Sequence, residues 1–203
     1  MSFTLLEDSN CIDVGAHTGD ILRDFVRLAP KGIHMAFEPL PHLASELERQ
    51  FPGVDVSSNA LAAEAGMAQF VFVKSSPAYS GLKVRSYPNP HETLETIEVQ
   101  TVRLDDVIPS GYVPHFIKVD VEGGELGVFQ GAVQTLRRHR PIVWFEHGIG
   151  GADWYGTTSE DVYDLLVADV QLRIFDADGN GPLSKGDFCG LFDKPIWNFL
   201  ARP

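Results

Sequence analysis

An acid and two glycines follow the first strongly apolar segment of the chain and form its first candidate site. In CIDVGAHTGD, residues 11–20, Asp13 precedes Gly15, and Gly19 follows four residues later. Glycine permits a sharp turn and a close approach of a ligand, because it has no Cβ. The N–H groups at the start of a following helix are unpaired and can bind a charged group. The pattern predicts a strand, a turn and a helix that bind a nucleotide-like ligand.

A second acid marks the end of the next apolar segment. GIHMAFEP, residues 32–39, predicts a buried strand that ends at Glu38 and is stopped by Pro39. A carboxylate at this place in an open parallel sheet can accept hydrogen bonds from both hydroxyls of a ribose. The glycine spacing does not match the G-x-G-x-x-G pattern of a pyrophosphate site and suits a charged amino-acid tail better. Together the two features indicate a nucleoside that carries an amino acid and a sulfonium, which is S-adenosylmethionine.

The elements that must position these residues alternate between strand and helix patterns. Strands are predicted at residues 10–15, 32–39, 54–61, 67–73, 115–123 and 141–148, with a closing pair at 172–181 and 196–203. Helices are predicted at residues 19–29, 41–51, 124–140 and 158–169. Strand–helix alternation with short connections predicts a parallel sheet with helices on both faces.

One long segment interrupts this alternation. Residues 74–100, KSSPAYSGLKVRSYPNPHETLETIEVQ, are rich in Ser, Pro and Tyr and show no clear period. Loops longer than about 12–15 residues are usually functional or disordered. Because the segment lies between core strands, we expect a lid-like insertion that faces the substrate. A passive surface loop is the alternative of equal weight.

Composition limits the classes of partner and the compartment. The 203 residues are enough for one domain with a full core and few for two. The net charge of −12 argues against a nucleic-acid partner, which would require neutralisation of phosphates. No segment approaches the roughly 18 apolar residues of a membrane span, and residues 1–10 lack the basic region and cleavage site of a signal peptide. We expect a cytoplasmic protein in which Cys11 and Cys189 are free thiols.

Several motifs together resemble the FkbM family of S-adenosylmethionine-dependent methyltransferases. In chain order they are CIDVGAHTGD, AFEPLPHLASELE, NALAAEAG, VRLDDVI and, most specific, FIKVDVEGGELGVFQGAVQTLRRHRPIVWFEH. The resemblance implies one Rossmann-like class I methyltransferase domain over residues 1–203, with a mostly parallel seven-stranded sheet, helices on both faces and an antiparallel last strand. It also implies S-adenosylmethionine as cofactor and methyl transfer to a hydroxyl of a small molecule such as a sugar, a lipid or another natural product.

The resemblance assigns roles by position. The residues implied to bind the cofactor are Asp13, Gly15, Ala16, His17 and Gly19 in the turn, Glu38 at the ribose, and Asn59 and Ala60 beside the adenine. His17 stands where the family often has Asn, and both a contact with the methionine carboxylate and plain exposure remain open. Family members often have helices before the first strand, where this sequence has about ten residues, so the insertion at 74–100 is the candidate cover for the substrate.

A hydroxyl acceptor loses a proton during methyl transfer, so a positioned base is expected. The candidates at the ends of the fifth and sixth predicted strands are Asp120, His147, Glu122 and Glu146. His147 has an ordinary pKa near neutrality, and it ranks almost equal with Asp120. Structural roles are the alternatives: Asp120 as a cap of the helix that begins at Gly124, and Glu146 as a partner of Lys118.

Three further interpretations compete with an O-methyltransferase. A metal bridging Asp120, Glu122 and His147 is possible on ligand types alone, but we expect no metal. Residues 176–187, DADGNGPLSKGD, nearly match a calcium-binding EF-hand loop. The last position is Asp187 instead of Glu and the flanks do not predict helices, so DG and NG here predict a hairpin. A non-catalytic S-adenosylmethionine-binding module is the third alternative.

Overall fold

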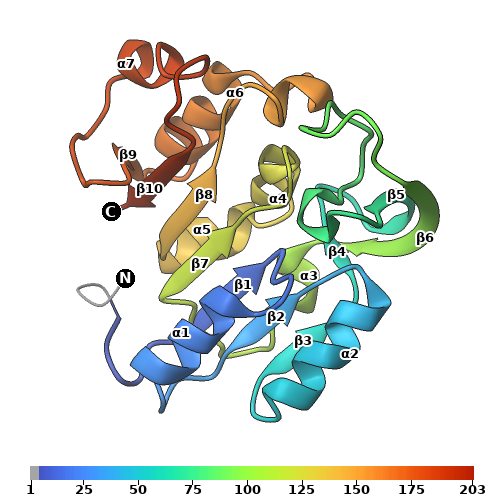
Figure 1. Ribbon diagram of the computed structural model, residues 1–203. Helices are drawn as coiled ribbons and strands as arrows, with labels where there is room; N and C mark the ends of the chain where they lie inside the picture. The colour runs from blue at the N-terminus through green and yellow to red at the C-terminus, as the bar shows by residue number, and fades with distance from the viewer. Residues whose placement is uncertain (1–4) are drawn as a thin grey trace.

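The computed structural model describes residues 5–203, in which ten strands form two sheets (Figure 1). The main sheet has seven strands in the order β3-β2-β1-β7-β8-β10-β9. Its strands are β1 (Cys11–Val14), β2 (Met35–Phe37), β3 (Asp55–Ser57), β7 (Phe116–Val119), β8 (Ile142–Glu146), β9 (Arg173–Asp176) and β10 (Asn198–Arg202). β10 pairs antiparallel with β8 and β9, whereas the five strands β3, β2, β1, β7 and β8 of this sheet are parallel to one another. The predicted mostly parallel seven-stranded sheet with an antiparallel last strand is confirmed.

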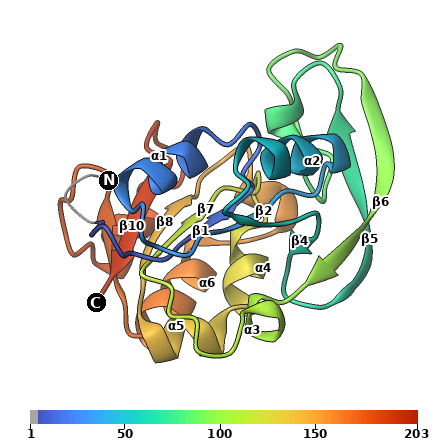
Figure 2. The ribbon, with the colours of Figure 1, turned by 90° about the horizontal axis from the view of Figure 1, so that it is seen from below.

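Helices cover both faces of the main sheet (Figure 2). α1 (Asp20–Leu28) and α2 (Pro41–Gln50) lie on one face; α4 (Glu125–Gln130), α5 (Val133–His139) and α6 (Ser159–Tyr163), which continues into η3 (Asp164–Asp169), lie on the other. The short elements are α3 (Leu104–Val107), α7 (Lys185–Cys189), η1 (Pro77–Tyr79) and η2 (Ala152–Tyr155). None of the helices within residues 5–203 has the length and apolar character needed to cross a membrane.

The prediction of a single helix over 124–140 is wrong, because the helix is interrupted between α4 and α5. At Gly131 the backbone passes so close to Ala62 that a Cβ would overlap the carbonyl oxygen of that residue. Ala132 then leaves the helical conformation with φ −121° before α5 begins. The break lets two short helices follow the twisted sheet.

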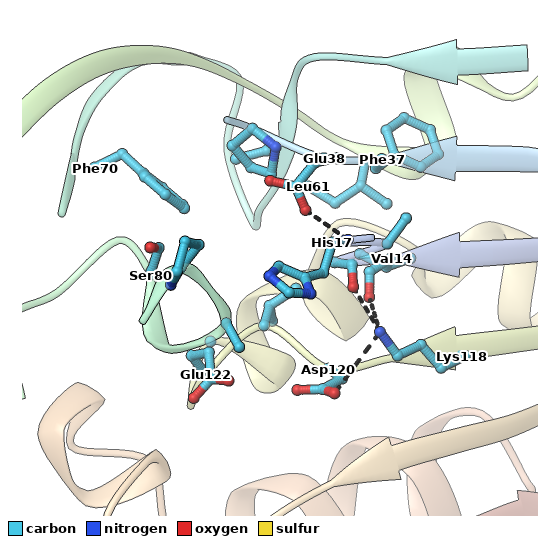
Figure 3. Close-up of a pocket in the computed structure, with 18 of the residues that line it drawn as sticks. Val14, His17, Phe37, Glu38, Leu61, Phe70, Ser80, Lys118, Asp120 and Glu122 are labelled. Carbon is cyan, nitrogen blue, oxygen red and sulfur yellow. Dashed lines mark hydrogen bonds and ion pairs between the residues drawn. The ribbon is translucent and has the colours of Figure 1, made fainter. Parts of the chain in front are cut away.

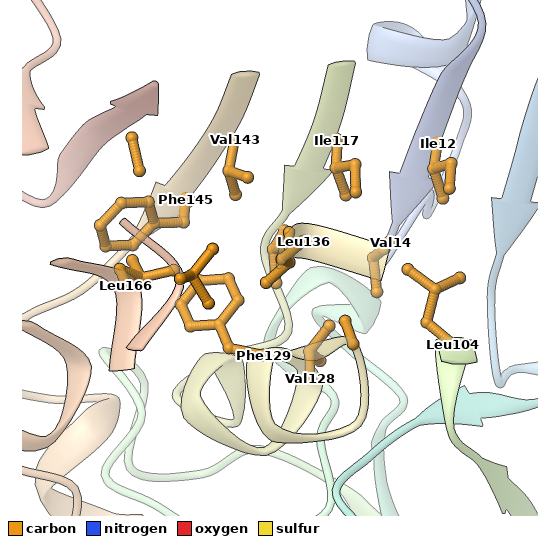
Figure 4. Packing of buried hydrophobic residues seen from close by; sticks show 14 of the residues in the cluster. Ile12, Val14, Leu104, Ile117, Val128, Phe129, Leu136, Val143, Phe145 and Leu166 are labelled. Carbon is orange, nitrogen blue, oxygen red and sulfur yellow. The ribbon is translucent and has the colours of Figure 1, made fainter. Parts of the chain in front are cut away.

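Alternation along the strands divides the core between the two faces. Ile12, Val14 and Ile117 point to the face covered by α4 and α5, where they join Phe129 and Leu136 in one buried cluster (Figure 4). The opposite face buries Cys11, Phe116, and the α1 side chains of Leu22 and Phe25. Asp13 and Lys118 interrupt this second set, and they are register partners on neighbouring strands. Two charged residues are therefore buried side by side in the core next to the strand ends.

The smaller sheet contains β4 (Ala60–Leu61), β5 (Gly66–Val73) and β6 (Leu94–Val102), and it flanks the main sheet beyond α2 (Figures 1 and 2). The insertion predicted at 74–100 is too long, because residues 94–100 belong to β6. Ile97 and Val99 alternate with exposed polar residues there and pack against Leu40 and Phe70. The part between the strands, residues 74–93, is called the insertion loop below.

The calcium-like segment at 176–187 has another role. Asp176 accepts a 2.8 Å hydrogen bond from the backbone N–H of Asn180, and Ser184 caps α7 together with Asp187. β9 and β10 pair as expected, but the segment that connects them along the chain contains α7. The hairpin predicted from DG and NG is therefore wrong. Within residues 5–203 no three His, Cys, Asp or Glu side chains are grouped so as to hold a metal ion.

Candidate functional site

A cavity of about 230 Å³ opens at the carboxyl ends of β1, β2 and β7 (Figure 3). The predicted site residues that line it are Gly15, Ala16, His17, Glu38, Asn59, Ala60, Asp120 and Glu122. The predicted residues that do not line it are Asp13, Gly19, Glu146 and His147. The sequence analysis gave no site role to Phe70 from β5 or Lys118 from β7, which also line the cavity. Pro77, Ala78, Ser80 and Leu82 line it too, and they belong to the segment that was expected to face the substrate.

The turn after β1 depends on glycine at two positions. Gly15 has φ +74°, and a Cβ there would overlap the carbonyl oxygen of Asp120. Gly19 has φ +80°, and a Cβ would lie 2.6 Å from the ring of Phe51. His17 between them has φ +48°, a conformation that costs a non-glycine residue energy. The turn is therefore held close to β7 on one side and to α2 on the other.

Asp13 lies beneath this turn and binds Lys118. The Lys118 Nζ is 3.3 Å from Oδ1 of Asp13, and it donates hydrogen bonds to the carbonyl oxygens of Gly15 (2.7 Å) and Val14 (3.2 Å). Burial raises the pKa of Asp13, and the Lys118 ammonium opposes this effect. Burial disfavours the charged form of Lys118, but Asp13 and Asp120 outweigh it and raise the Lys118 pKa. Lys118 lines the cavity, and it also holds the backbone of the turn that borders it.

Glu38 joins the end of β2 to the same turn. Its Oε2 accepts the N–H of His17 at 2.8 Å (Figure 3). Its Oε1 accepts the N–H of Leu40 at 2.9 Å. Burial raises the pKa of Glu38, and the two backbone donors oppose this effect. Each carboxylate oxygen has a second acceptor site beyond the bond described. Glu38 therefore orients the turn and still offers acceptors at the cavity.

Apolar groups occupy the far side of the cavity from the turn. Ala60 and Leu61 come from β4 and the ring of Phe70 comes from β5, with the polar Asn59 just before β4. Figure 3 shows Phe70 beyond Glu38, on the opposite side from Lys118. An apolar side with an aromatic ring suits a flat heterocycle. The segment MAQFVFV ends in a continuous apolar run, so the sequence does not mark which of its residues point into the cavity.

Three acids gather where β7 and β8 end. Asp120 follows β7 and lies 3.7 Å from the ammonium of Lys118. Burial and the neighbouring Asp120 carboxyl raise the pKa of Glu146, at the end of β8, to about 7. Lys118 has Asp13 and Asp120 as its ion-pair partners, not Glu146. Glu122 has φ +61° and forms an ion pair with Arg85 of the insertion loop.

His147 lies away from this group of acids. Its Nε2 is 2.9 Å from Oγ of Ser159, and its ring stacks on Phe188 of α7 with 5.4 Å between centroids. Burial lowers the pKa of His147 to about 4, so the imidazole is neutral near pH 7. The structure thus packs His147 into the core beside α6 and α7 and does not bring it to the cavity.

The strand order and the cavity define the class of protein. A central β1, crossovers to both sides, an antiparallel last strand, and a ligand-sized cavity beside the β1 turn are the features of a class I methyltransferase fold. The model of the methyltransferase FkbM domain matches residues 13–169. The chain belongs to the FkbM methyltransferase family.

Solved structures share this fold at low sequence identity. The FkbM methyltransferase from Methylobacillus flagellatus KT is 15% identical with a TM-score of 0.60, and the match covers 96% of this chain and 44% of that one. This chain therefore spans less than half of that protein. A putative rRNA-methylase from Clostridium thermocellum gives 10% identity, a TM-score of 0.54, and coverage of 99% and 90%. A TehB-like SAM-dependent methyltransferase from Corynebacterium glutamicum ATCC 13032 Kitasato is 12% identical with a TM-score of 0.50, and the match covers 98% of this chain and 80% of that one. No curated protein sequence matches the chain.

Proposed function

We propose that the protein transfers a methyl group from S-adenosylmethionine to a hydroxyl of a small molecule. The observation that carries the proposal is the position of Glu38 and Asp120 on one cavity, at the ends of strands on either side of β1. Glu38 offers carboxylate acceptors of the kind that bind a ribose diol. Asp120 offers a base at the other end of the same cavity.

The residues around the cavity fit the parts of this cofactor. Ala60 and Phe70 provide an apolar side for adenine, Asn59 lies beside them, and Glu38 provides acceptors for the ribose. The N–H of Thr18 and the N–H groups at the N-terminus of α1 provide donors for the methionine carboxylate, because those of Gly15, Ala16 and His17 are donated to Phe37 and Glu38. When bound, S-adenosylmethionine supplies an electrophilic methyl group on its sulfonium.

Asp120 is the proposed base. Its carboxylate is in the cavity, Lys118 keeps a positive charge 3.7 Å away, and Glu146 lies behind it. Proton removal by a positioned base contributes about 10²–10⁴-fold to such a reaction. With the cofactor bound, Asp120 would accept the proton of the acceptor hydroxyl as the methyl group leaves the sulfur of S-adenosylmethionine for the hydroxyl oxygen, with S-adenosylhomocysteine as the leaving group. Glu146, with a pKa of about 7, would share the added proton.

The acceptor in this proposal is a small molecule and not a nucleic acid. The chain carries a net charge of −12, and the acids Asp120 and Glu122 line the acceptor end. A phosphate backbone binds through Lys and Arg, and its repulsion from these acids would weaken binding.

Release of S-adenosylhomocysteine in the presence of a panel of hydroxylated sugars, lipids and polyketides tests the proposal. We expect release with at least one hydroxylated acceptor, and we expect Asp120→Asn to retain cofactor binding while its turnover falls by about 10²–10⁴-fold. Full turnover in Asp120→Asn would remove Asp120 from the chemistry. Cofactor binding without release from any acceptor would instead favour a non-catalytic binding module.

A further inference from the structure

Arg85 joins the insertion loop to two other segments beside the acceptor end of the cavity. Its guanidinium forms an ion pair with Glu122 and donates a 3.1 Å hydrogen bond to the carbonyl oxygen of Gly150. The rings of Tyr79 and Tyr87 lie 5.3 and 6.0 Å from the guanidinium carbon. The side chains of Arg85 and Glu122 are only 11% and 17% exposed, so solvent screens their attraction weakly.

The insertion loop forms one wall of the cavity through Pro77, Ala78, Ser80 and Leu82. The first half of the loop is held by β5, because Gly81 and Val71 exchange two backbone hydrogen bonds and Ser80 Oγ accepts the N–H of Val73. The second half passes through Arg85, which reaches the turn after β7. The wall is thus anchored to the small sheet at one end and to the main sheet at the other.

Glu122 has a mostly buried carboxylate and lies in a strained turn, so its ion pair with Arg85 stabilises it. It adopts φ +61°, which is unfavourable for a residue with a side chain, and it sits between Asp120 and the buried Glu125. Oε1 of Glu125 accepts the N–H groups of Val121 (3.0 Å) and Gly123 (3.2 Å), and these two hydrogen bonds hold the backbone of the turn. Arg85 fixes it from the side of the insertion loop.

We propose that Arg85 is a positioning residue for the methyl transfer. It fastens the insertion loop over the acceptor end of the cavity, so that the acceptor is enclosed between the apolar groups of the loop and the carboxylate of Asp120. The inference rests on the proposed function. The apolar wall of Pro77, Ala78 and Leu82 suits an acceptor with an uncharged face beside its hydroxyl.

The guanidinium is the group that the geometry requires. One planar fork reaches both the Glu122 carboxylate and the Gly150 carbonyl, whereas a lysine ammonium would bind at one point. Arg85→Lys is therefore expected to recover only part of the function of the native side chain. Arg85→Gln leaves Glu122 without its cation.

Hydrogen–deuterium exchange of residues 74–93 tests this fastening without any acceptor. The variants are Arg85→Gln, Glu122→Gln and their combination, with Arg27→Gln as the control, because Arg27 forms an exposed ion pair with Asp24. Exchange is compared with that of the β1 peptide in the same molecule, which corrects for global unfolding. We expect each single variant to speed exchange in the insertion loop about tenfold relative to β1, the combination to add little, and the control to stay within about twofold. Loop exchange within about twofold of native in Arg85→Gln, or additive effects in the combination, would overturn the proposal.

Binding and kinetics then separate this inference from the proposed function. Arg85→Gln is expected to bind S-adenosylhomocysteine within about twofold of the native protein, because Arg85 is outside the cofactor side of the cavity. With an acceptor that supports turnover, its KM is expected to rise about tenfold, with a smaller fall in kcat and partial recovery in Arg85→Lys. Unchanged KM and kcat would overturn the positioning role. Failure of the native protein to bind S-adenosylhomocysteine would overturn the proposed function, while the exchange result still decides whether Arg85 fastens the loop.

Discussion

The Lys118 ammonium donates a 2.7 Å hydrogen bond to the carbonyl oxygen of Gly15 while it lies 3.3 Å from Oδ1 of Asp13. One buried cation therefore ties β7 to both the end of β1 and the turn that follows it. The turn borders the cavity, whereas Asp13 itself does not. Lys118 thus borders the cavity directly, whereas Asp13 acts on it through Lys118 and the backbone of the turn.

Lys118→Met is expected to lower the free energy of unfolding by about 3–5 kcal/mol, because it leaves the buried Asp13 carboxylate without its cation. Urea denaturation at pH 7 measures the change. The double variant Asp13→Asn/Lys118→Met is expected to lose less than the sum of the two single variants. Additive losses would show that the two side chains do not depend on each other.

Gly15→Ala is expected to lower the free energy of unfolding by about 1–3 kcal/mol or more and to weaken binding of S-adenosylhomocysteine. The residue has φ +74°, and a Cβ would overlap the Asp120 carbonyl oxygen. The matched control is Gly53→Ala, where a Cβ meets no atom within 4 Å. The control is expected to stay within about 1 kcal/mol of the native protein. Equal melting temperatures for the two variants would contradict the close approach of β1 and β7.

Much of the fold and part of the cavity were predictable, because the relevant residues directly follow buried strands. Gly15, Glu38 and Asp120 each come at the end of an apolar run, and parallel strands end at one edge of a sheet. The face to which an acid points was harder to predict, since these strands are buried on both sides. Asp13 is fully buried beside its register partner Lys118, and of the two only Lys118 lines the cavity.

His147 shows the limit of local reasoning. Glu146 and His147 are adjacent, and successive residues at a strand end face opposite ways. Only the position of Phe188, more than forty residues later, shows that the histidine side is the aromatic core. Arg85 was equally hidden, because the insertion loop has no period, and its partners Glu122 and Gly150 are distant in the sequence.

Glu146 is expected to titrate near pH 7, because burial and the Asp120 carboxyl raise its pKa. Carboxyl-carbon NMR of labelled glutamates measures this value. Asp120→Asn is expected to lower the Glu146 pKa without restoring the ordinary value, since burial remains. A Glu146 pKa that does not change in Asp120→Asn would contradict the proximity of the two carboxyl groups.

The same shift predicts how stability depends on pH. The folded protein holds the Glu146 proton up to about pH 7, whereas the unfolded chain releases it near its ordinary value of 4.5. The stabilisation is therefore complete below about pH 4.5 and is lost as the pH rises through about 7. The native protein should lose stability relative to Glu146→Gln over this interval, and a constant difference would contradict the shift.

His147 is expected to give the opposite dependence. Its folded pKa is about 4 against an ordinary 6.5, so the stabilisation is present above about pH 6.5 and is lost as the pH falls through about 4. The size is on the order of 3 kcal/mol at 1.36 kcal/mol for each pKa unit. Denaturation of the native protein and His147→Gln between pH 4 and 7 measures it. His147→Gln is also expected to keep turnover at pH 7.5, and a loss of 10²-fold or more in a stably folded variant would return the imidazole to the chemistry.

Calorimetric titration of S-adenosylhomocysteine into the native protein and into Glu38→Ala tests the central claim most directly. We predict saturable binding by the native protein and a loss of about 2–4 kcal/mol of binding free energy in Glu38→Ala, because two charge-assisted hydrogen bonds to the ribose disappear. Circular dichroism confirms that the variant remains folded. Equal affinity in the folded variant, or no binding by the native protein, would contradict the assignment of this cavity to an adenosyl cofactor held by Glu38.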